Sequence, residues 1–165
     1  MKHIPLLQKE LEQEAAITRR FLERVPIEAP DYKPHEKSMA LKDLAAHLAE
    51  LPGWVAMALH TSELDFGAMD YQPTVYHSTE ELLQIFDKAL GESKAALSAA
   101  QEEDLLPSWT MRTGDQVHAV FTKHEVIRHA LAQTIHHRAQ LGVYFRLQDI
   151  PVPATYGPSA DEQGF

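Results

Sequence analysis

The chain has 165 residues, carries a formal net charge of −9, contains 44% hydrophobic residues and has no cysteine. This length fits one domain, which we expect to span residues 1–165, and the hydrophobic content excludes a disordered chain. The lack of cysteine excludes disulfide bonds and cysteine chemistry. The negative charge is unfavourable for a surface that follows phosphates, so no nucleic-acid partner is expected.

The sequence contains no run of about 18 uncharged apolar residues, so we expect neither a membrane span nor a membrane partner. Its first residues, MKHIPLLQKELEQE, turn acidic and polar early, whereas a secretory signal keeps a longer apolar stretch. Together with the lack of cysteine, this favours a cytoplasmic protein.

Apolar residues recur at steps of three and four positions in four stretches, which is the spacing that places them on one helix face. In the third stretch, Ser78 followed by Glu81 resembles a capping box, which marks a helix start. In the second stretch, Pro52 has no N–H for the carbonyl of Leu48 and should kink the helix. The predicted helices span residues 5–25, 39–61, 79–100 and 122–147.

The segment at residues 104–122 is interrupted by Pro107 and by the turn-forming tripeptide at residues 113–115. An irregular connection and a short hairpin are both compatible with it. The proline-rich segment that follows residue 148 is expected to form an extended C-terminal strap over the helices. With four amphipathic helices and no convincing run of strands, the sequence predicts an all-α four-helix bundle.

Ten histidines stand out, because histidine is a frequent metal ligand and acid–base group. His137 lies at the edge of the apolar stripe of the fourth predicted helix, and Gln133 precedes it by one turn on the same side. His47 lies in the apolar stripe of the second helix, which continues to Trp54. Spacing alone leaves two interpretations of His47 open, a hydrogen-bonded core residue and a metal ligand. One residue on one helix and an i, i+4 pair on another can supply the three protein ligands of a catalytic zinc-type site.

Two further histidines of the fourth helix, His129 and His136, fall nearly opposite its core direction. We interpret them as a solvated face or a subunit contact rather than as ligands. A homodimer is expected, since cyclic dimers are the commonest oligomers.

Three segments carry a family resemblance. The most specific segment is IHHRAQLGVYFRLQDIPVPATYGPSADE at residues 135–162. The others are SMALKDLAAHLAELPGWVAMAL at residues 38–59 and DFGAMDYQP at residues 65–73. These segments resemble proteins of the DinB-like family, and the resemblance covers nearly the whole chain. The resemblance implies an antiparallel four-helix bundle with a long crossing connection.

The resemblance also implies a divalent metal, nickel or zinc, held by one histidine on the second helix and two on the last. Carried over by position, the ligands fall at His47, Gln133 and His137, so glutamine stands where the family pattern has histidine. Trp54 and the loop at residues 62–77 would shape the pocket around them. Such ions favour an imidazole nitrogen over an amide oxygen, so weak metal binding is expected.

The wider superfamily includes enzymes that transfer low-molecular-weight thiols or use them as cofactors. The resemblance therefore implies a metal-dependent enzyme acting on a small molecule, of the thiol transferase or hydrolase-like kind, and it identifies no catalytic residue. The alternatives are a non-catalytic small-molecule-binding or stress-response module that has lost its metal, and a structural homodimer.

Overall fold

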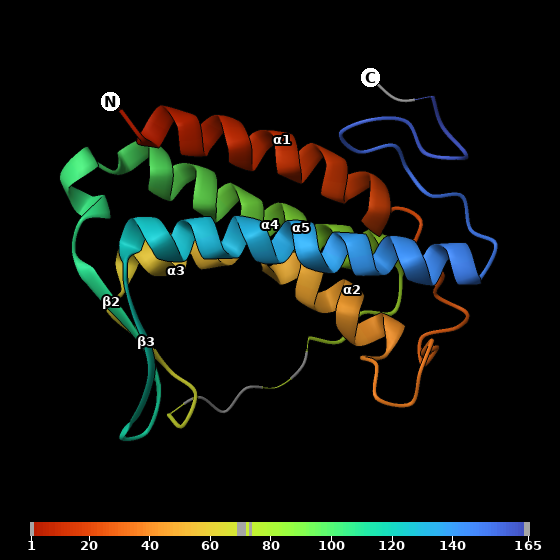
Figure 1. Cartoon of the computed structure of the whole chain (residues 1–165), viewed down its shortest axis with the longest axis horizontal. Coiled ribbons are helices and arrows are strands. Elements are labelled where there is room, and N and C mark those ends of the chain that lie inside the picture. Colours follow the sequence, from red (N-terminus) through yellow and green to blue (C-terminus); the bar gives the residue numbers. More distant parts are fainter. Residues whose placement is uncertain (1, 69–71, 73, 164–165) are drawn as a thin grey trace.

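The computed structural model describes residues 2–68, 72 and 74–163. In it, the chain folds into helices that pack side by side and a small sheet at one end of them (Figure 1). The α-helices are α1 (Ile4–Leu22), α2 (Leu41–Glu50), α3 (Gly53–His60), α4 (Thr79–Ala99) and α5 (Lys123–Leu147). The strands are β1 (Glu63–Asp65), β2 (Ser108–Thr113) and β3 (Gln116–Thr122), and a short 3₁₀ helix at Glu102–Leu105 precedes β2. Within these described ranges, no helix is long and apolar enough to cross a lipid bilayer.

The helices surround a hydrophobic core that runs along their length. α1 and the α2–α3 pair each pack against both α4 and α5. The core consists of two clusters of buried side chains, and Trp54 and Leu90 pack against both of them. Burying one side chain such as leucine or phenylalanine contributes roughly 1.5–3 kcal/mol to folding. Central members of the core include Phe21, Leu44, Phe86, Phe145, Leu11, Val55, Leu97 and Ile127.

The prediction of an all-α four-helix bundle is wrong, because the described chain is a mixed α/β structure with five α-helices and a sheet. β1 pairs in parallel with β2, and β2 pairs antiparallel with β3, which gives the order β1-β2-β3. The β2–β3 hairpin projects from one end of the helices (Figure 1). β1 lies in the loop at residues 62–77, where no strand is expected from the sequence. The β2–β3 hairpin lies in the segment at residues 104–122, for which a short hairpin is one of the two open interpretations.

The hairpin depends on a tight turn and on one buried tryptophan. Gly114 has a φ of +54°, in the left-handed region that glycine enters at little cost. Trp109 of β2 is fully buried against the helices, and its Nε1–H donates a 2.9 Å hydrogen bond to Oγ1 of Thr61. The residues of β3 are exposed or half-buried, so the strand has no fully buried face. Its sequence alternates polar and apolar residues only over positions 116–119, which is a weak strand signal.

The second predicted helix is divided at Pro52 into α2 and α3, rather than kinked within one helix. The buried hydroxyl of Ser93 on α4 bridges this break. It donates a 2.6 Å hydrogen bond to the carbonyl of Pro52 and accepts one of 3.2 Å from the N–H of Ala56. Ser93 therefore satisfies the N–H of Ala56. It also gives the carbonyl of Pro52, which accepts from the N–H of Val55 at 3.1 Å, a second partner. The break also positions the site, because His47 and Trp54 lie on opposite sides of it.

We expect Ser93→Ala to lower the free energy of unfolding by about 1–3 kcal/mol, because the buried N–H of Ala56 would lose its partner and the carbonyl of Pro52 would lose one of its two hydrogen bonds. Urea denaturation measures this change. Ser98→Ala is the matched control, since the exposed hydroxyl of Ser98 accepts only a long 3.4 Å hydrogen bond from Gln8. The control should change stability by no more than about 0.5 kcal/mol. Equal losses in the two variants would show that Ser93 does not bridge the break.

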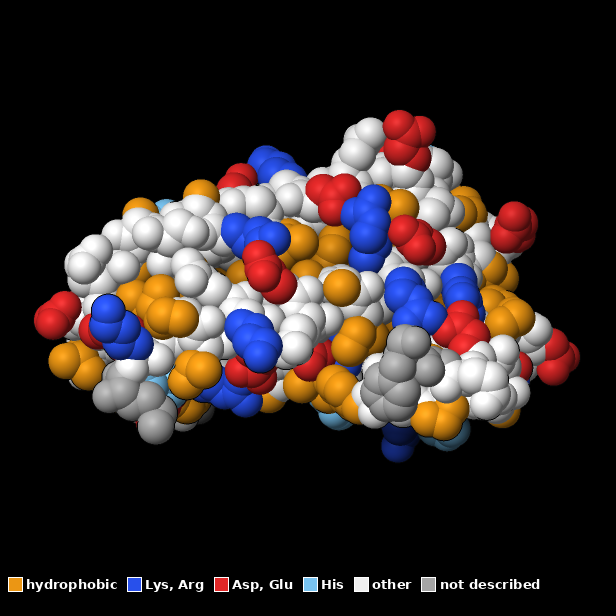
Figure 2. Space-filling model, turned by 90° about the horizontal axis from the view of Figure 1, so that it is seen from above, with side chains coloured by type: hydrophobic (Ala, Val, Ile, Leu, Met, Phe, Trp, Pro, Cys, Tyr) orange, Lys and Arg blue, Asp and Glu red, His pale blue; other side chains and the backbone are white. Residues whose placement is uncertain are grey.

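The C-terminal strap, residues 150–163, crosses α1 and α5 and is held by ion pairs. The backbone N–H of Ala154 and the guanidinium of Arg24 lower the pKa of Glu162 to about 2, so this carboxylate stays charged at neutral pH. Figure 2 shows positive and negative side chains interspersed on the face that carries α1 and the strap. The ion pairs of the strap are Glu162 with Arg20 and Arg24, and Asp161 with Arg146.

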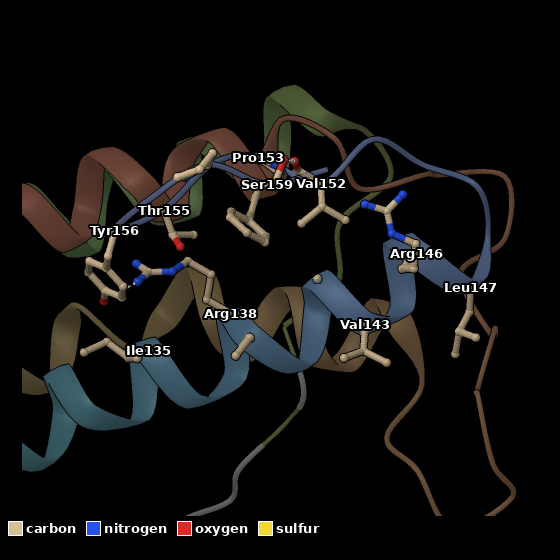
Figure 3. A pocket seen from close by; sticks show the side chains of 14 residues that line it. Ile135, Arg138, Val143, Arg146, Leu147, Val152, Pro153, Thr155, Tyr156 and Ser159 are labelled. Carbon is tan, nitrogen blue, oxygen red and sulfur yellow. Dashed lines mark hydrogen bonds between the residues drawn. The ribbon is translucent and has the colours of Figure 1, made fainter. Parts of the chain in front are cut away.

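A buried ion pair attaches the strap to the core. The guanidinium of Arg138 on α5 is almost fully buried, and its Nη2 lies 2.7 Å from Oε2 of Glu14 on α1. The hydroxyl of Tyr156 in the strap donates to the same carboxylate at 2.7 Å. It accepts a hydrogen bond from Nη2 of Arg138 at 2.6 Å (Figure 3). Nη1 of Arg138 donates to Oγ1 of Thr18 at 3.0 Å. Each buried charge therefore has both a counter-charge and further hydrogen bonds.

Candidate functional site

His47 on α2 and His137 on α5 face each other where these two helices pack together. Their ring centroids are 4.7 Å apart and the ring planes meet at 85°, an edge-to-face arrangement. Both side chains are half-buried. Two imidazoles that are far apart in the sequence therefore lie within reach of one bound ion or molecule.

Two glutamine side chains contact the ring of His137. Oε1 of Gln133, one turn earlier on α5, lies 2.9 Å from Nε2, and Oε1 of Gln140 lies 3.0 Å from Nδ1. A neutral imidazole has one donor and one acceptor nitrogen, so one of the two amides must present its NH₂ group instead. His47, in contrast, forms no hydrogen bond to the side chains that the structure describes, and its ring lines a pocket.

Both imidazoles are neutral at physiological pH. Burial lowers the pKa of His47, and the nearby His137 lowers it further. Burial also lowers the pKa of His137, the hydrogen bond from its ring to Oε1 of Gln140 raises it, and the nearby His136 lowers it further. Neutral imidazole is the form that binds metal ions, so the pair is available as ligands without loss of a proton.

We expect acidification to destabilise the fold through this histidine pair. The folded-state pKa values of His47 and His137 lie below the ordinary value of 6.5. At a pH between the lowered values and the ordinary value, the unfolded chain therefore binds more protons than the folded chain. The stabilisation is complete above a pH of about 6.5 and is lost as the pH falls towards the lowered values.

Thermal unfolding at a series of pH values checks this expectation. His47→Gln should lose less stability than the wild type when the pH is lowered below about 6.5. His60→Gln alters an exposed histidine at the end of α3 and should keep the wild-type dependence. Identical pH dependence of the wild type and His47→Gln would contradict the linkage.

The donor set fits an incomplete metal site. His47 and His137 supply two converging nitrogens, and the oxygen of Gln133 lies beside one of them. Among the described residues, no group of three or more His, Cys, Asp or Glu side chains could hold an ion. The residues present therefore fit two strong positions and one weak position of a coordination sphere, and not the three-histidine set of the family pattern.

A cavity of about 680 Å³ adjoins His47. Trp54 lines it, as expected from the sequence, and so do Leu64, Phe66 and Thr74 from the loop at residues 62–77. Residues 69–71 and 73 of that loop lie outside the described residues. On the other side of the pair, His137 and Gln140 line a smaller hollow next to Met39, which borders both spaces.

Two expectations about the other histidines have different outcomes. His136 is exposed, as predicted. His129 is half-buried rather than exposed, because its ring lies 6.0 Å from the ring of Phe121, in a stacked arrangement, and 6.4 Å from that of Trp54. Its role as a subunit contact stays a prediction.

Sequence reasoning missed Asp43 and Glu50, two carboxylates that line the same cavity as His47. Their spacing from His47, four residues before and three after, places all three side chains on one face of α2 and could have identified them. It also missed the contact of Gln140 with His137.

The structure is thus a mainly helical α/β domain in which two histidines from different helices converge beside a largely apolar cavity. The chain belongs to the DinB family, whose family model matches residues 1–163.

Solved structures support the fold at low sequence identity. A DinB-like protein from Bacillus subtilis is 18% identical with a TM-score of 0.70, covering 91% of this chain and 97% of that one. A DinB-like protein from Bacillus cereus is 17% identical with a TM-score of 0.70, covering 91% and 95%. A DinB family structure from Exiguobacterium sibiricum is 20% identical with a TM-score of 0.70, covering 92% and 95%. No curated protein matches the chain.

Proposed function

We propose that this DinB family protein binds a divalent metal, nickel or zinc, through His47 and His137, with Gln133 as a weak third ligand. The metal would activate a small molecule that binds in the adjoining cavity. The observation that carries the proposal is the convergence of two neutral imidazoles from α2 and α5, with ring centroids 4.7 Å apart. Metal–nitrogen bonds are about 2.0–2.1 Å long, so rings this close can share one ion after small side-chain rotations.

The donor set suits thiol transfer or hydrolysis. Two protein nitrogens and one amide oxygen leave coordination positions for water or substrate. A metal bound there would act as a Lewis acid that lowers the pKa of a thiol or of water. We therefore propose a low-molecular-weight thiol as the substrate class, with the side chains of Trp54 and Met57 against its apolar part.

A non-catalytic binding module is the second candidate function, and one observation favours it. Both ring nitrogens of His137 already have glutamine partners, at 2.9 Å and 3.0 Å. If these hydrogen bonds persist in solution, the metal position is closed and the cavity binds a small molecule alone. A stress-response role would then rest on ligand binding.

We also propose a homodimer. The exposed side of α5 carries Val143 and Leu147, which are 56% and 57% exposed. They border a groove of about 440 Å³ between α5 and the strap (Figure 3). Exposed apolar side chains of this kind favour a contact between two copies. A monomer mass from light scattering at micromolar concentration would contradict this proposal.

Metal analysis of protein purified without a histidine tag tests the proposed function. After equilibrium dialysis against zinc, the wild type should retain the ion, whereas His47→Gln and His137→Gln should each lose it. His60→Gln is the control and should behave as the wild type, because that histidine is exposed at the end of α3. Equal retention in all four proteins would place the metal elsewhere and contradict the proposal.

A further inference from the structure

The cavity beside His47 combines negative charge with aromatic and apolar side chains. Asp43, His47 and Glu50 follow one face of α2, and all three line the cavity. No lysine or arginine occurs among the described residues that line it. The remaining lining is mostly apolar, from Met39, Ala46, Trp54, Met57, Leu64 and Phe66.

Neither of the two carboxylates forms an ion pair with any described residue, unlike many acidic residues of this chain. Glu50 is half-buried and accepts a hydrogen bond from the hydroxyl of Thr74. Asp43 is exposed; the adjacent Lys42 is attracted to it but forms its ion pair with Asp31 at 2.6 Å. Two carboxylates without an ion pair therefore border a largely apolar cavity, beside which a positive charge is attracted more strongly than in bulk water.

We propose that this cavity binds a molecule with an apolar body and a positively charged amine. The apolar body would lie against Trp54 and Phe66, whose ring faces also attract cations. The ammonium would lie between the carboxylates of Asp43 and Glu50. The inference rests on the proposed use of this cavity as a small-molecule site, but it does not need the metal.

The charge of the cavity also narrows the substrate class proposed above. An anionic thiol would be repelled by Asp43 and Glu50, whereas a thiol that carries an amine would satisfy both the carboxylates and a metal at His47. An amine that accepts a transferred group would fit equally well. The inference therefore favours aminothiols and amines over thiols that carry carboxylates.

A matched set of phenylbutylamine, phenylbutanol and phenylbutyrate tests the proposal by calorimetry, with the wild-type protein in the presence of a metal chelator. These probes share one apolar body and differ in charge. The amine should bind about tenfold more tightly than the alcohol, and the carboxylate should bind most weakly. Raising the salt concentration should weaken amine binding and leave alcohol binding nearly unchanged.

The double variant D43N/E50Q should reduce amine affinity to that of the alcohol while it retains alcohol binding, which shows that the cavity remains formed. Glu80→Gln, at an exposed position on α4, is the control and should keep the preference for the amine. Tighter or equal binding of phenylbutyrate, or binding of none of the probes, would overturn the inference. Because the chelator removes the metal, a failure of the metal proposal would leave these results unchanged and can be recognised separately.

Discussion

Replacing Gln133 with histidine should tighten the binding of nickel or zinc by about a hundredfold or more, because an imidazole nitrogen would replace an amide oxygen in the coordination sphere. Position 133 is one turn before His137 on α5, and its side chain already reaches Nε2 of that ring at 2.9 Å. The new imidazole would therefore enter next to the existing pair. Competition titration against a chromophoric chelator measures both affinities.

Gln84→His is the matched control, because it adds a histidine at an exposed position of α4 without enlarging the pair. It should bind metal as weakly as the wild type. Equal affinity of the wild type and Gln133→His would show that position 133 lies outside the coordination sphere. If neither protein binds metal, the non-catalytic binding module becomes the better account of the cavity.

Arg138→Met should lower the free energy of unfolding by about 3–5 kcal/mol, because it leaves the buried carboxylate of Glu14 without its counter-charge. The strap would also lose one of its anchors, since Tyr156 hydrogen bonds to both members of the pair. Urea denaturation gives the loss of stability. Limited proteolysis of the native protein should cut the strap of the variant faster than that of the wild type.

Arg128→Met is the matched control, because Arg128 pairs with Glu10 between the same two helices but both side chains are partly exposed. Its loss should stay below about 1 kcal/mol. The double variant E14M/R138M should recover part of the stability, because no buried charge remains unpaired. Similar losses in Arg138→Met and Arg128→Met would contradict the special role of the buried pair.

Helix positions could be predicted well where local signals and the apolar stripe agree. Ser78 accepts a hydrogen bond from the N–H of Glu81, as its position in the sequence predicted, and α4 begins at Thr79. The stripes also placed His47 and His137 at the core side of their helices. Their convergence depends on how α2 and α5 pack, which the family resemblance indicated and spacing alone did not.

The complete sheet, the surroundings of His129 and the carboxylates at the cavity were not predicted, because they depend on contacts between helices and strands that are distant in the sequence. The hairpin at residues 104–122 stayed one of two open interpretations, because Trp109 packs against the helices and β3 alternates polar and apolar residues only over positions 116–119. His129 is less exposed than its helix position indicated, because Trp54 from α3 and Phe121 from β3 lie close to its ring. Asp43 and Glu50 are recognised as candidate site residues from the cavity that they line.

The central claim is that His47 and His137 act together as metal ligands, and nitrogen-15 NMR of the histidine rings during a zinc titration tests it most directly. The ring nitrogens of His47 and His137 should shift together at the lowest zinc concentrations, before those of an exposed histidine outside the pair such as His60. Shifts that begin at the exposed histidines, with no change at His47 and His137, would contradict the claim.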